Sequence, residues 1–203
     1  QQAFLQSPPL EDLTAIDVGD WNSTAACGRT ADGLVTCWDG DNTFASAAPP
    51  GSYCDISVGD TVGCGLSDDG TLACWGASAR GILESPSQWP DDVSMVDVAP
   101  GHACAIDVST QLARCWGDTW ANAPDEPLTW LSTGQIHTCG LKTDGRITCW
   151  GDDAYGQVSG ASTLPEDLKF VTVAAGGWHS CALDTTGAVH CWGDDTYGQS
   201  TPP

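Results

Sequence analysis

The stretch CWGDDAYGQ, Cys149 to Gln157, returns 42 residues later as CWGDDTYGQ, Cys191 to Gln199. A shorter form, a Cys-Trp pair that glycine or aspartate follows, occurs at three earlier places. The five copies place a tryptophan at Trp38, Trp75, Trp116, Trp150 and Trp192. Self-similarity at a spacing of roughly 40 residues indicates a repeat architecture rather than isolated cysteine sites.

Ten of the eleven cysteines form pairs within these repeats. The two members of each pair lie 10 or 11 residues apart, and the first member recurs every 35 to 42 residues. The pairs are Cys27 and Cys37, Cys64 and Cys74, Cys104 and Cys115, Cys139 and Cys149, and Cys181 and Cys191. The spacing differs from the C-x2-C pattern of zinc and thioredoxin-like sites. We therefore expect disulfides, and with them an oxidising compartment.

The segment between paired cysteines is typical of a β-hairpin. In the first copy the turn signal is Asp32-Gly33, and pairing Cys27 with Cys37 leaves a three-residue loop, 31–33, that ends in a left-handed glycine. The two cysteines then form a non-hydrogen-bonded pair with Cα atoms about 4.5 Å apart, which suits a disulfide. In the third copy a four-residue loop, 108–111, restores the same pairing class. We predict one disulfide within each hairpin, each stabilising by roughly 3 kcal/mol.

The repeated tryptophan follows the second cysteine directly, and successive side chains of a strand point to opposite faces. Each indole therefore points away from its neighbouring cysteine. A unit of a few short strands cannot bury its own apolar face and must stack on its neighbours. We expect the five tryptophans to pack between adjacent units rather than to stack on a ligand.

The stretch VTVAAGGWHSCALDTTGAVHCWGDDTYGQ, Val171 to Gln199, resembles the repeat of the regulator of chromosome condensation family. That pattern is an apolar strand ending in glycine, then histidine, a short strand, Asp-Gly, another strand, Trp-Gly and Gly-Gln. The fourth copy matches it at Gly134, His137, Leu141, Asp144, Gly145, Trp150, Gly151, Gly156 and Gln157. The resemblance covers about residues 13–199 and implies a β-propeller with four-stranded blades. A disulfide in each repeat resembles secreted bacterial members rather than nuclear ones. The family usually has seven repeats, whereas this chain has five.

We therefore predict an all-β chain. Residues 13–203 form a single β-propeller domain of about five short blades, with one intra-hairpin disulfide in each. Residues 1–12 form an N-terminal tail, which either completes the last blade or pairs with another subunit.

The charge of the chain limits its partners. Twenty-seven acidic residues against six basic ones give a formal net charge of −21. Such a field repels phosphates, so we expect neither nucleic acid nor anionic lipid as a partner. No apolar run reaches 18 residues, so no membrane span is expected. Together with the cysteines, this predicts a secreted protein, extracellular or at the cell surface.

No catalytic constellation is recognisable. The chain has no G-x-S-x-G nucleophile motif and no phosphate-binding loop. His102, His137 and His179 share one repeat position, and we expect them to be structural rather than metal ligands. Asp152-Asp153 is expected to bond backbone amides in a turn. We predict no enzyme activity, no cofactor and no metal.

Two residues fall outside the repeat pattern. Cys54 is either unpaired and buried as a small apolar residue, or joined to another chain by an intermolecular disulfide. Asn22, in Asn22-Ser23-Thr24, is the one glycosylation acceptor motif of the chain.

These observations predict a secreted, non-enzymatic propeller that acts as an extracellular binding or assembly module for an unidentified protein or glycan ligand. Four tryptophans outside the repeated position are candidate contacts: Trp89, Trp120, Trp130 and Trp178. One alternative is lectin-like carbohydrate binding. Another is a structural subunit of an extracellular filament or surface layer, with self-association through Cys54 or the N-terminal tail.

Overall fold

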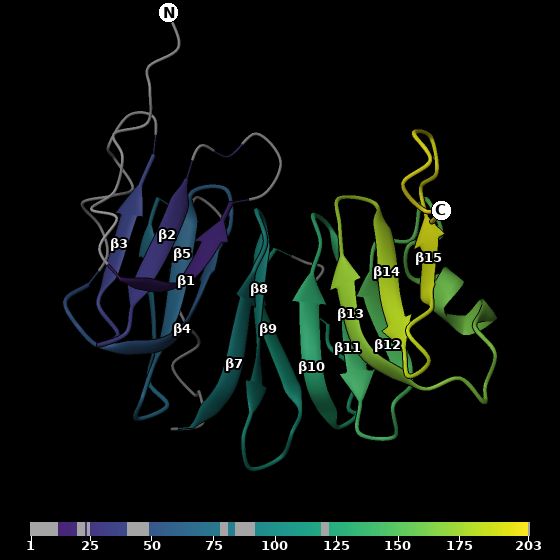
Figure 1. The fold of residues 1–203 in the computed structure, drawn as a ribbon, viewed down its shortest axis with the longest axis horizontal. Helices are drawn as coiled ribbons and strands as arrows, with labels where there is room; N and C mark the ends of the chain where they lie inside the picture. Colours follow the sequence, from purple (N-terminus) through teal and green to yellow (C-terminus); the bar gives the residue numbers. More distant parts are fainter. Residues whose placement is uncertain are drawn as a thin grey trace, which may run out of the picture.

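The computed structural model describes residues 12–19, 23, 25–39, 49–77, 81–83, 92–118 and 122–202. Its strands form five antiparallel sheets of three strands each, one sheet per repeat, which we name blades 1 to 5 in chain order (Figure 1). The strands are β1 (Leu13–Val18), β2 (Ala26–Thr30) and β3 (Val35–Trp38) in blade 1; β4 (Tyr53–Val58), β5 (Val62–Ser67) and β6 (Leu72–Gly76) in blade 2; β7 (Val93–Val98), β8 (His102–Asp107) and β9 (Ala113–Gly117) in blade 3; β10 (Leu128–Thr133), β11 (His137–Lys142) and β12 (Ile147–Gly151) in blade 4; and β13 (Phe170–Ala175), β14 (His179–Asp184) and β15 (Val189–Gly193) in blade 5. The prediction of an all-β chain of five blades is confirmed.

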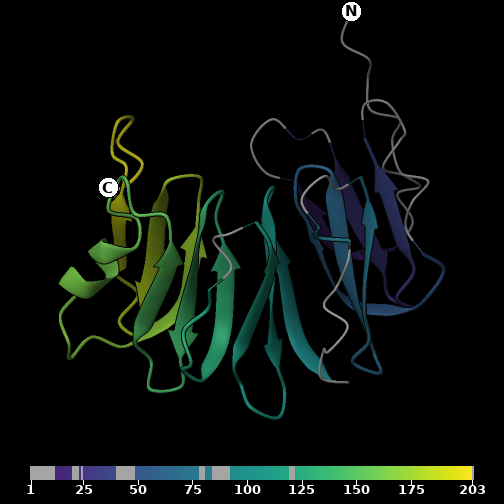
Figure 2. The ribbon, with the colours of Figure 1, turned by 180° about the vertical axis from the view of Figure 1, so that it is seen from behind.

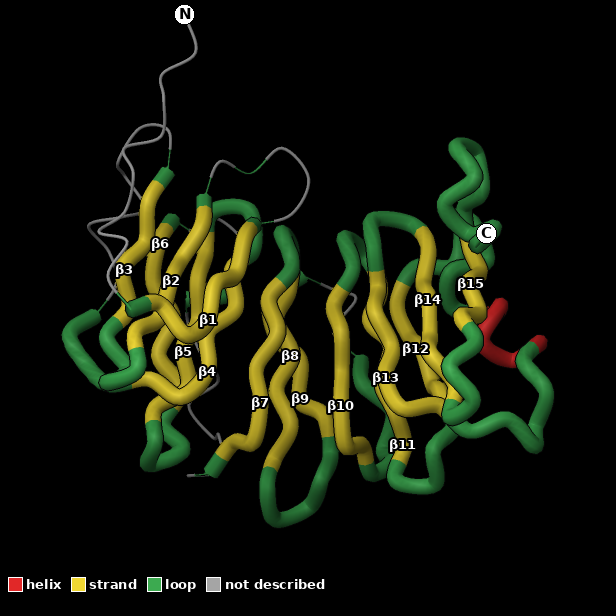
Figure 3. Tube along the Cα trace, viewed as in Figure 1, coloured by secondary structure: helices red, strands yellow, loops and turns green. Residues whose placement is uncertain are grey.

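The blades stand side by side in chain order, from purple blade 1 to yellow blade 5 (Figures 1 and 2). The first strands of neighbouring blades contact one another, and the second strand of each blade contacts the first strand of the next. Blades 1 and 5 lie at opposite ends of the long axis. Turns between second and third strands, such as the β8–β9 turn at the bottom of Figure 3, define the hairpin face. Turns between first and second strands, such as the β13–β14 turn at the top, define the loop face.

Among the described residues each sheet has three strands, one fewer than the family resemblance implies. The blade 4–blade 5 connection, residues 152–169, is described throughout and shows why. It contains a short 3₁₀ helix, η1 (Ser159–Thr163), and turns, but no strand. The connection begins with a tightly hydrogen-bonded loop and runs through Pro165, which leaves little continuous backbone that could pair with β12.

The five hairpins have the predicted register and disulfides. Cys27 pairs with Cys37 across β2 and β3, and the Thr30 amide donates to the Leu34 carbonyl at 3.0 Å. Gly33 closes the three-residue loop with φ +82°. In the third repeat the loop is one residue longer, and Gln111 takes the left-handed conformation with φ +59°. All five disulfides form within their hairpins, with Cα atoms 4.0 to 4.1 Å apart.

The core lies between blades, where the disulfide side of one blade meets the tryptophan side of the next. Trp75 of blade 2 shares a buried cluster with Cys27 and Cys37 of blade 1, and Trp192 of blade 5 shares one with Cys139 of blade 4. Four tryptophans are therefore buried, at 3% to 7% exposure: Trp75, Trp116, Trp150 and Trp192. Trp38 of blade 1 is only half-buried.

The glycine after the repeated tryptophan ends the third strand. Gly76, Gly117, Gly151 and Gly193 have φ values from +100° to +110°, which side-chain-bearing residues rarely adopt. A Cβ on Gly151 would also lie 2.7 Å from the Ile136 carbonyl oxygen. The Trp-Gly motif therefore marks the place where the chain turns out of the sheet towards the next blade.

The first strand of every blade contains a β-bulge at its second residue. In blades 1 to 4 this residue points its polar atom at a carbonyl of the second strand: Thr14 at Arg29, Cys54 at Leu66, Ser94 at Ile106 and Thr129 at Leu141, at 3.2 to 3.3 Å. Cys54 forms no disulfide within the chain and is exposed, so the expectation that it is buried is wrong, whereas the intermolecular disulfide stays a prediction. The bulge is the physical reason, since the extra residue leaves the ladder on the outer side; the equivalent Val171 is 53% exposed as well.

Candidate functional site

The first set of contacts between blades joins their first strands, and we call each one an acceptor joint. A side chain of one blade accepts a hydrogen bond from a backbone amide of the next. Asp17 accepts from Val58 at 2.6 Å, Ser57 from Val98 at 3.0 Å, Asp97 from Thr133 at 2.7 Å, and Ser132 from Ala175 at 3.1 Å. Blade 5 carries Ala174 at this position and offers no acceptor.

Asp97 is the centre of this chain of joints. Its second carboxylate oxygen accepts a hydrogen bond from the Ser57 hydroxyl at 2.9 Å, so the residue ties blade 3 to both of its neighbours. Desolvation outweighs these hydrogen bonds and raises the pKa of Asp97 to about 6. The sequence did not reveal this role; aligning the residue before the last residue of each first strand would have shown that Asp or Ser recurs there.

The second set of contacts, the histidine joints, uses the repeated histidine. The Nε2 atom of His102 lies 2.8 Å from the Thr138 hydroxyl, and that of His137 lies 2.8 Å from the Ser180 hydroxyl. All four side chains are fully buried. Because Ser180 donates to the Gln157 carbonyl, its lone pairs are left to accept from His137. Desolvation lowers the pKa of both imidazoles to about 4, so they are neutral at pH 7.

The structure therefore distributes the histidines over separate joints and does not gather them around one ion. The part of the chain that the structure describes contains no group of three or more His, Cys, Asp or Glu side chains placed to hold a metal. In blades 1 and 2, Ala25 and Val62 stand at the histidine position. Val62 and Ala103 of blade 3 share a buried cluster, so the same joint is apolar there.

The two Asp-Asp-x-Tyr-Gly-Gln loops are held by their own side chains. Asp152 accepts from the Ala154 amide and the Gln157 side chain, both at 3.0 Å. Asp153 accepts from the amides of Val158 and Ser159. The loop after blade 5 repeats the pattern with Asp194, Asp195 and Gln199. These acids fold the loop, as expected from turn chemistry.

Of the four candidate tryptophans outside the repeated position, Trp130 and Trp178 are described. Trp130 is 46% exposed on β10. Trp178 lies in the β13–β14 turn on the loop face, where it stacks on Tyr155 with ring centroids 5.7 Å apart. Trp89, Trp120, Asn22 and the tail up to residue 11 lie outside the described residues, so the structure leaves those predictions open.

A cleft of about 190 Å³ opens between blades 4 and 5 near the hairpin face. The 142–147 hairpin of blade 4 forms one side of it, and the 161–168 connection forms the other. Its apolar lining consists of Ile147, Ala161, Leu164, Pro165, Leu168 and Phe170. Ser162 and Glu166 add polar groups at the side of the connection.

Two of the six basic residues of the chain, Lys142 and Arg146, line this cleft. Lys142 lies 3.3 Å from Glu126, and Arg146 forms a 2.6 Å ion pair with Asp144 while its side chain stays 51% exposed. A third cation, Lys169, packs over Gly145 of the same hairpin. Sequence reasoning missed this cluster because the three residues belong to two repeats; the scarcity of cations is the signal that could have found it.

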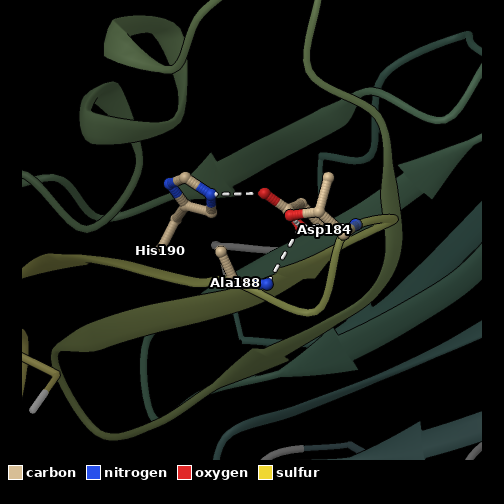
Figure 4. A network of polar contacts seen from close by, with 4 residues as sticks. Asp184, Ala188 and His190 are labelled. Carbon is tan, nitrogen blue, oxygen red and sulfur yellow. Dashed lines mark hydrogen bonds and ion pairs between the residues drawn. The ribbon is translucent and has the colours of Figure 1, made fainter.

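A carboxylate–imidazole pair lies behind the cleft. Asp184 Oδ2 is 2.9 Å from His190 Nε2, and Asp184 also accepts from the Ala188 amide at 3.0 Å (Figure 4). The Thr186 hydroxyl and His190 hold the pKa of Asp184 below its ordinary value. The His190 ring meets Phe170 edge-on at 5.6 Å. The pair thus fastens the β14–β15 turn and supports the Phe170 wall of the cleft.

The structure has relatives among extracellular receptor domains. The ectodomain of the Physcomitrella patens receptor kinase CR4 is 26% identical with a TM-score of 0.77; the match covers 89% of this chain and 53% of that one. The CRINKLY WD40 ectodomain of the Arabidopsis thaliana receptor kinase ACR4 is 25% identical with a TM-score of 0.76, covering 90% of this chain and 69% of that one. The chain therefore spans about half of the first relative and about two thirds of the second.

A yeast protein shares the fold. Prp20p from Saccharomyces cerevisiae is 14% identical with a TM-score of 0.73, and the match covers 93% of this chain and 59% of that one. Among the described residues, no helix is long and apolar enough to cross a membrane.

Residues 131–157 and 170–199 match the family model of the regulator of chromosome condensation (RCC1) repeat. The chain is an RCC1-like β-propeller with a disulfide in each of its five repeats.

Proposed function

We propose that the chain is a secreted, non-enzymatic recognition module that binds an acidic peptide segment of a partner protein in the cleft between blades 4 and 5. Five disulfides and the similarity to two receptor kinase ectodomains support an extracellular setting. The observation that carries the proposal is the position of the cations.

The net charge of −21 means that most of the surface repels an acidic ligand. Three of the six basic residues nevertheless lie on or beside one cleft: Lys142, Arg146 and Lys169. Cations gathered at one place in a negative field favour the binding of an acidic ligand there and select its orientation. The guanidinium of Arg146 can bind a carboxylate in a bidentate manner once it exchanges its exposed partner Asp144.

The cleft also limits the size of the ligand group that it can bind. Its volume of about 190 Å³ accommodates one or two side chains, and its apolar lining suits an aliphatic or aromatic group next to the carboxylate. A peptide that places Asp or Glu, or a terminal carboxylate, beside such a residue matches this surface.

The experiment is selection from a random dodecapeptide library displayed on phage, with the disulfide-intact chain as bait. We expect enrichment of Asp or Glu beside an apolar residue, and binding that weakens as salt rises. Arg146→Gln should abolish binding of the selected peptides. Arg114→Gln is the matched control, because it removes the same charge from an exposed position on β9 of blade 3.

Selected peptides that bind Arg146→Gln as tightly as the parent chain would overturn the assignment of the cleft. Enrichment of basic peptides, which the overall charge favours, would show that the global field and not the local cations governs recognition.

Carbohydrate binding is the second candidate function, and the stacked pair of Tyr155 and Trp178 on the loop face favours it. Tyr155 is 51% exposed and offers a ring face on which a sugar can stack. A glycan array separates the two candidates: a signal that Trp178→Ala removes and Arg146→Gln leaves unchanged supports a lectin, and no signal on any glycan rejects it.

A further inference from the structure

The end blades expose positions that are buried or partly buried in the other blades. Ile16 and Val18 of blade 1 are 62% and 60% exposed. Their equivalents in blade 2, Ile56 and Val58, are 7% and 2% exposed because they pack on blade 1. The side of blade 1 that carries Ile16 and Val18, its leading face, therefore has the composition of a blade–blade interface but no blade against it.

Blade 5 exposes the opposite side, which we call its trailing face and define by His179, Cys181, Leu183 and Val189. In blades 1 to 4 the cysteine equivalent to Cys181 is fully buried at 0% exposure, whereas Cys181 is partly exposed. Val189 is 48% exposed. His179 has the position of His102 and His137, but no following blade supplies a hydroxyl to it.

The loop face shows the same difference. Tyr155 of blade 4 stacks on Trp178 of blade 5, and this contact crosses the joint. Its equivalent after blade 5, Tyr197, is 89% exposed. The histidine and the tyrosine through which blade 4 contacts blade 5 thus have counterparts on blade 5, His179 and Tyr197, that contact no further blade among the described residues.

Blade 1 is a poor match for that position. The histidine joint needs a hydroxyl at the place of Thr138 and Ser180, where blade 1 carries Ala26. A histidine buried against alanine would lose its hydrogen bond, which is costly for a buried polar group.

We propose that the trailing face of blade 5 is an interaction surface for a further repeat of the same kind that carries Ser or Thr at the position of Ser180. Blade 1, whether of the same chain or of a second copy, is not its partner. The selection rests on one hydrogen bond to His179 and on apolar packing over Cys181, Leu183 and Val189.

The test supplies such a repeat to the intact chain. A copy of residues 158–199 is inserted after Gln199, so that the junction reproduces the native Gln157–Val158 step and the copy presents its own serine to His179. In the copy, the equivalents of His179 and His190 are replaced by alanine and threonine, the residues found at Ala25 and Thr148. Carbethoxylation by diethyl pyrocarbonate, read by mass spectrometry of peptides, then reports on the histidines of the parent chain without a contribution from the copy.

In the 203-residue chain we expect His179 to react, as does His190, whose side chain is 29% exposed. Fully buried His102 and His137 should be protected. In the extended chain the reaction of His179 should slow by at least about tenfold, because a buried ring reacts only through local opening, while His190 is unchanged. A copy with alanine at the Ser180 position should give clearly weaker protection.

The proposal is overturned if the disulfide of the copy forms and His179 still reacts as fast as in the parent chain. It is also overturned if the copy stays reduced and protease-sensitive, because the trailing face then does not support a repeat. Equal protection by the serine and alanine copies would refute the selection for a hydroxyl. Sedimentation of the unextended chain as oligomers with protected His179 would identify blade 1 of a second copy as the partner and contradict the proposal.

Discussion

The joints between blades 1, 2 and 3 and those between blades 3, 4 and 5 bury the same repeat position with opposite chemistry. Val62 meets Ala103 in an apolar joint, whereas His137 and Ser180 form a fully buried hydrogen bond. The surrounding strands, disulfides and tryptophans keep their arrangement in both. The comparison indicates that a joint can be apolar or hydrogen-bonded, provided that the two residues of the pair are both apolar or both polar.

The largest expected effect comes from breaking that agreement in the apolar half. Val62→His places an imidazole opposite Ala103, where it has no hydroxyl partner and more volume than the site holds. We expect a loss of about 2–4 kcal/mol in the free energy of unfolding, from a buried unpaired polar group and overpacking. Urea denaturation with the disulfides intact measures it.

A second substitution, added to Val62→His, tests whether the missing hydroxyl causes the loss of stability. Adding Ala103→Ser supplies the hydroxyl and should recover about 1 kcal/mol, the usual net contribution of a hydrogen bond. If Val62→His alone unfolds no more easily than the parent chain, joint pairing does not govern stability in this half.

The acceptor joints allow a comparison between aspartate and serine. Asp97 has a pKa of about 6 in the folded protein against an ordinary value of 3.8, so the folded state binds its proton more tightly than the unfolded state. Its contribution to stability is therefore fully present below about pH 4 and is lost as pH rises through about 6, by on the order of 3 kcal/mol.

Asp97→Asn should remove this dependence while keeping an acceptor for the Thr133 amide. The difference between the two unfolding free energies, measured by urea titration at pH 4, 5, 6 and 7, isolates Asp97, because the remaining carboxylates titrate in both proteins. Parallel pH profiles would show that the residue is solvated and that desolvation does not set its pKa.

The smallest effect is expected at the bulge of blade 2. Serine already stands at the equivalent Ser94, where it donates to the same kind of carbonyl. Cys54→Ser should thus change the unfolding free energy by no more than about 0.5 kcal/mol. Partial desolvation and the Asp68 carboxylate raise the pKa of the Cys54 thiol, which disfavours the thiolate that forms disulfides. Non-reducing gels should accordingly show the parent chain as a monomer, and a dimer band that Cys54→Ser removes would contradict this.

The hairpins could be predicted from sequence because cysteine spacing, the Asp32-Gly33 turn and strand parity are all local. The exposure of Cys54 could not, since a single bulged residue reverses the side on which a side chain lies. The three-stranded blade was not predicted, because the number of strands in a blade was taken from the family resemblance and not from the sequence of the 152–169 connection. The cleft forms because blade 5 places Phe170 next to the hairpin that carries Lys142 and Arg146. These residues belong to different repeats, so no local sequence pattern predicts that they lie together.

The most direct test of the pairing account is a double-mutant cycle across the blade 4–blade 5 joint. Ser180→Ala removes the acceptor of the buried His137 ring, and His137→Ala removes the donor to the Ser180 hydroxyl. The double variant gives this joint the apolar character of the first two. We predict that the double variant is more stable than the sum of the single changes implies, by about 1–2 kcal/mol. Strict additivity of the two changes would contradict the claim that the blades are joined by matched pairs.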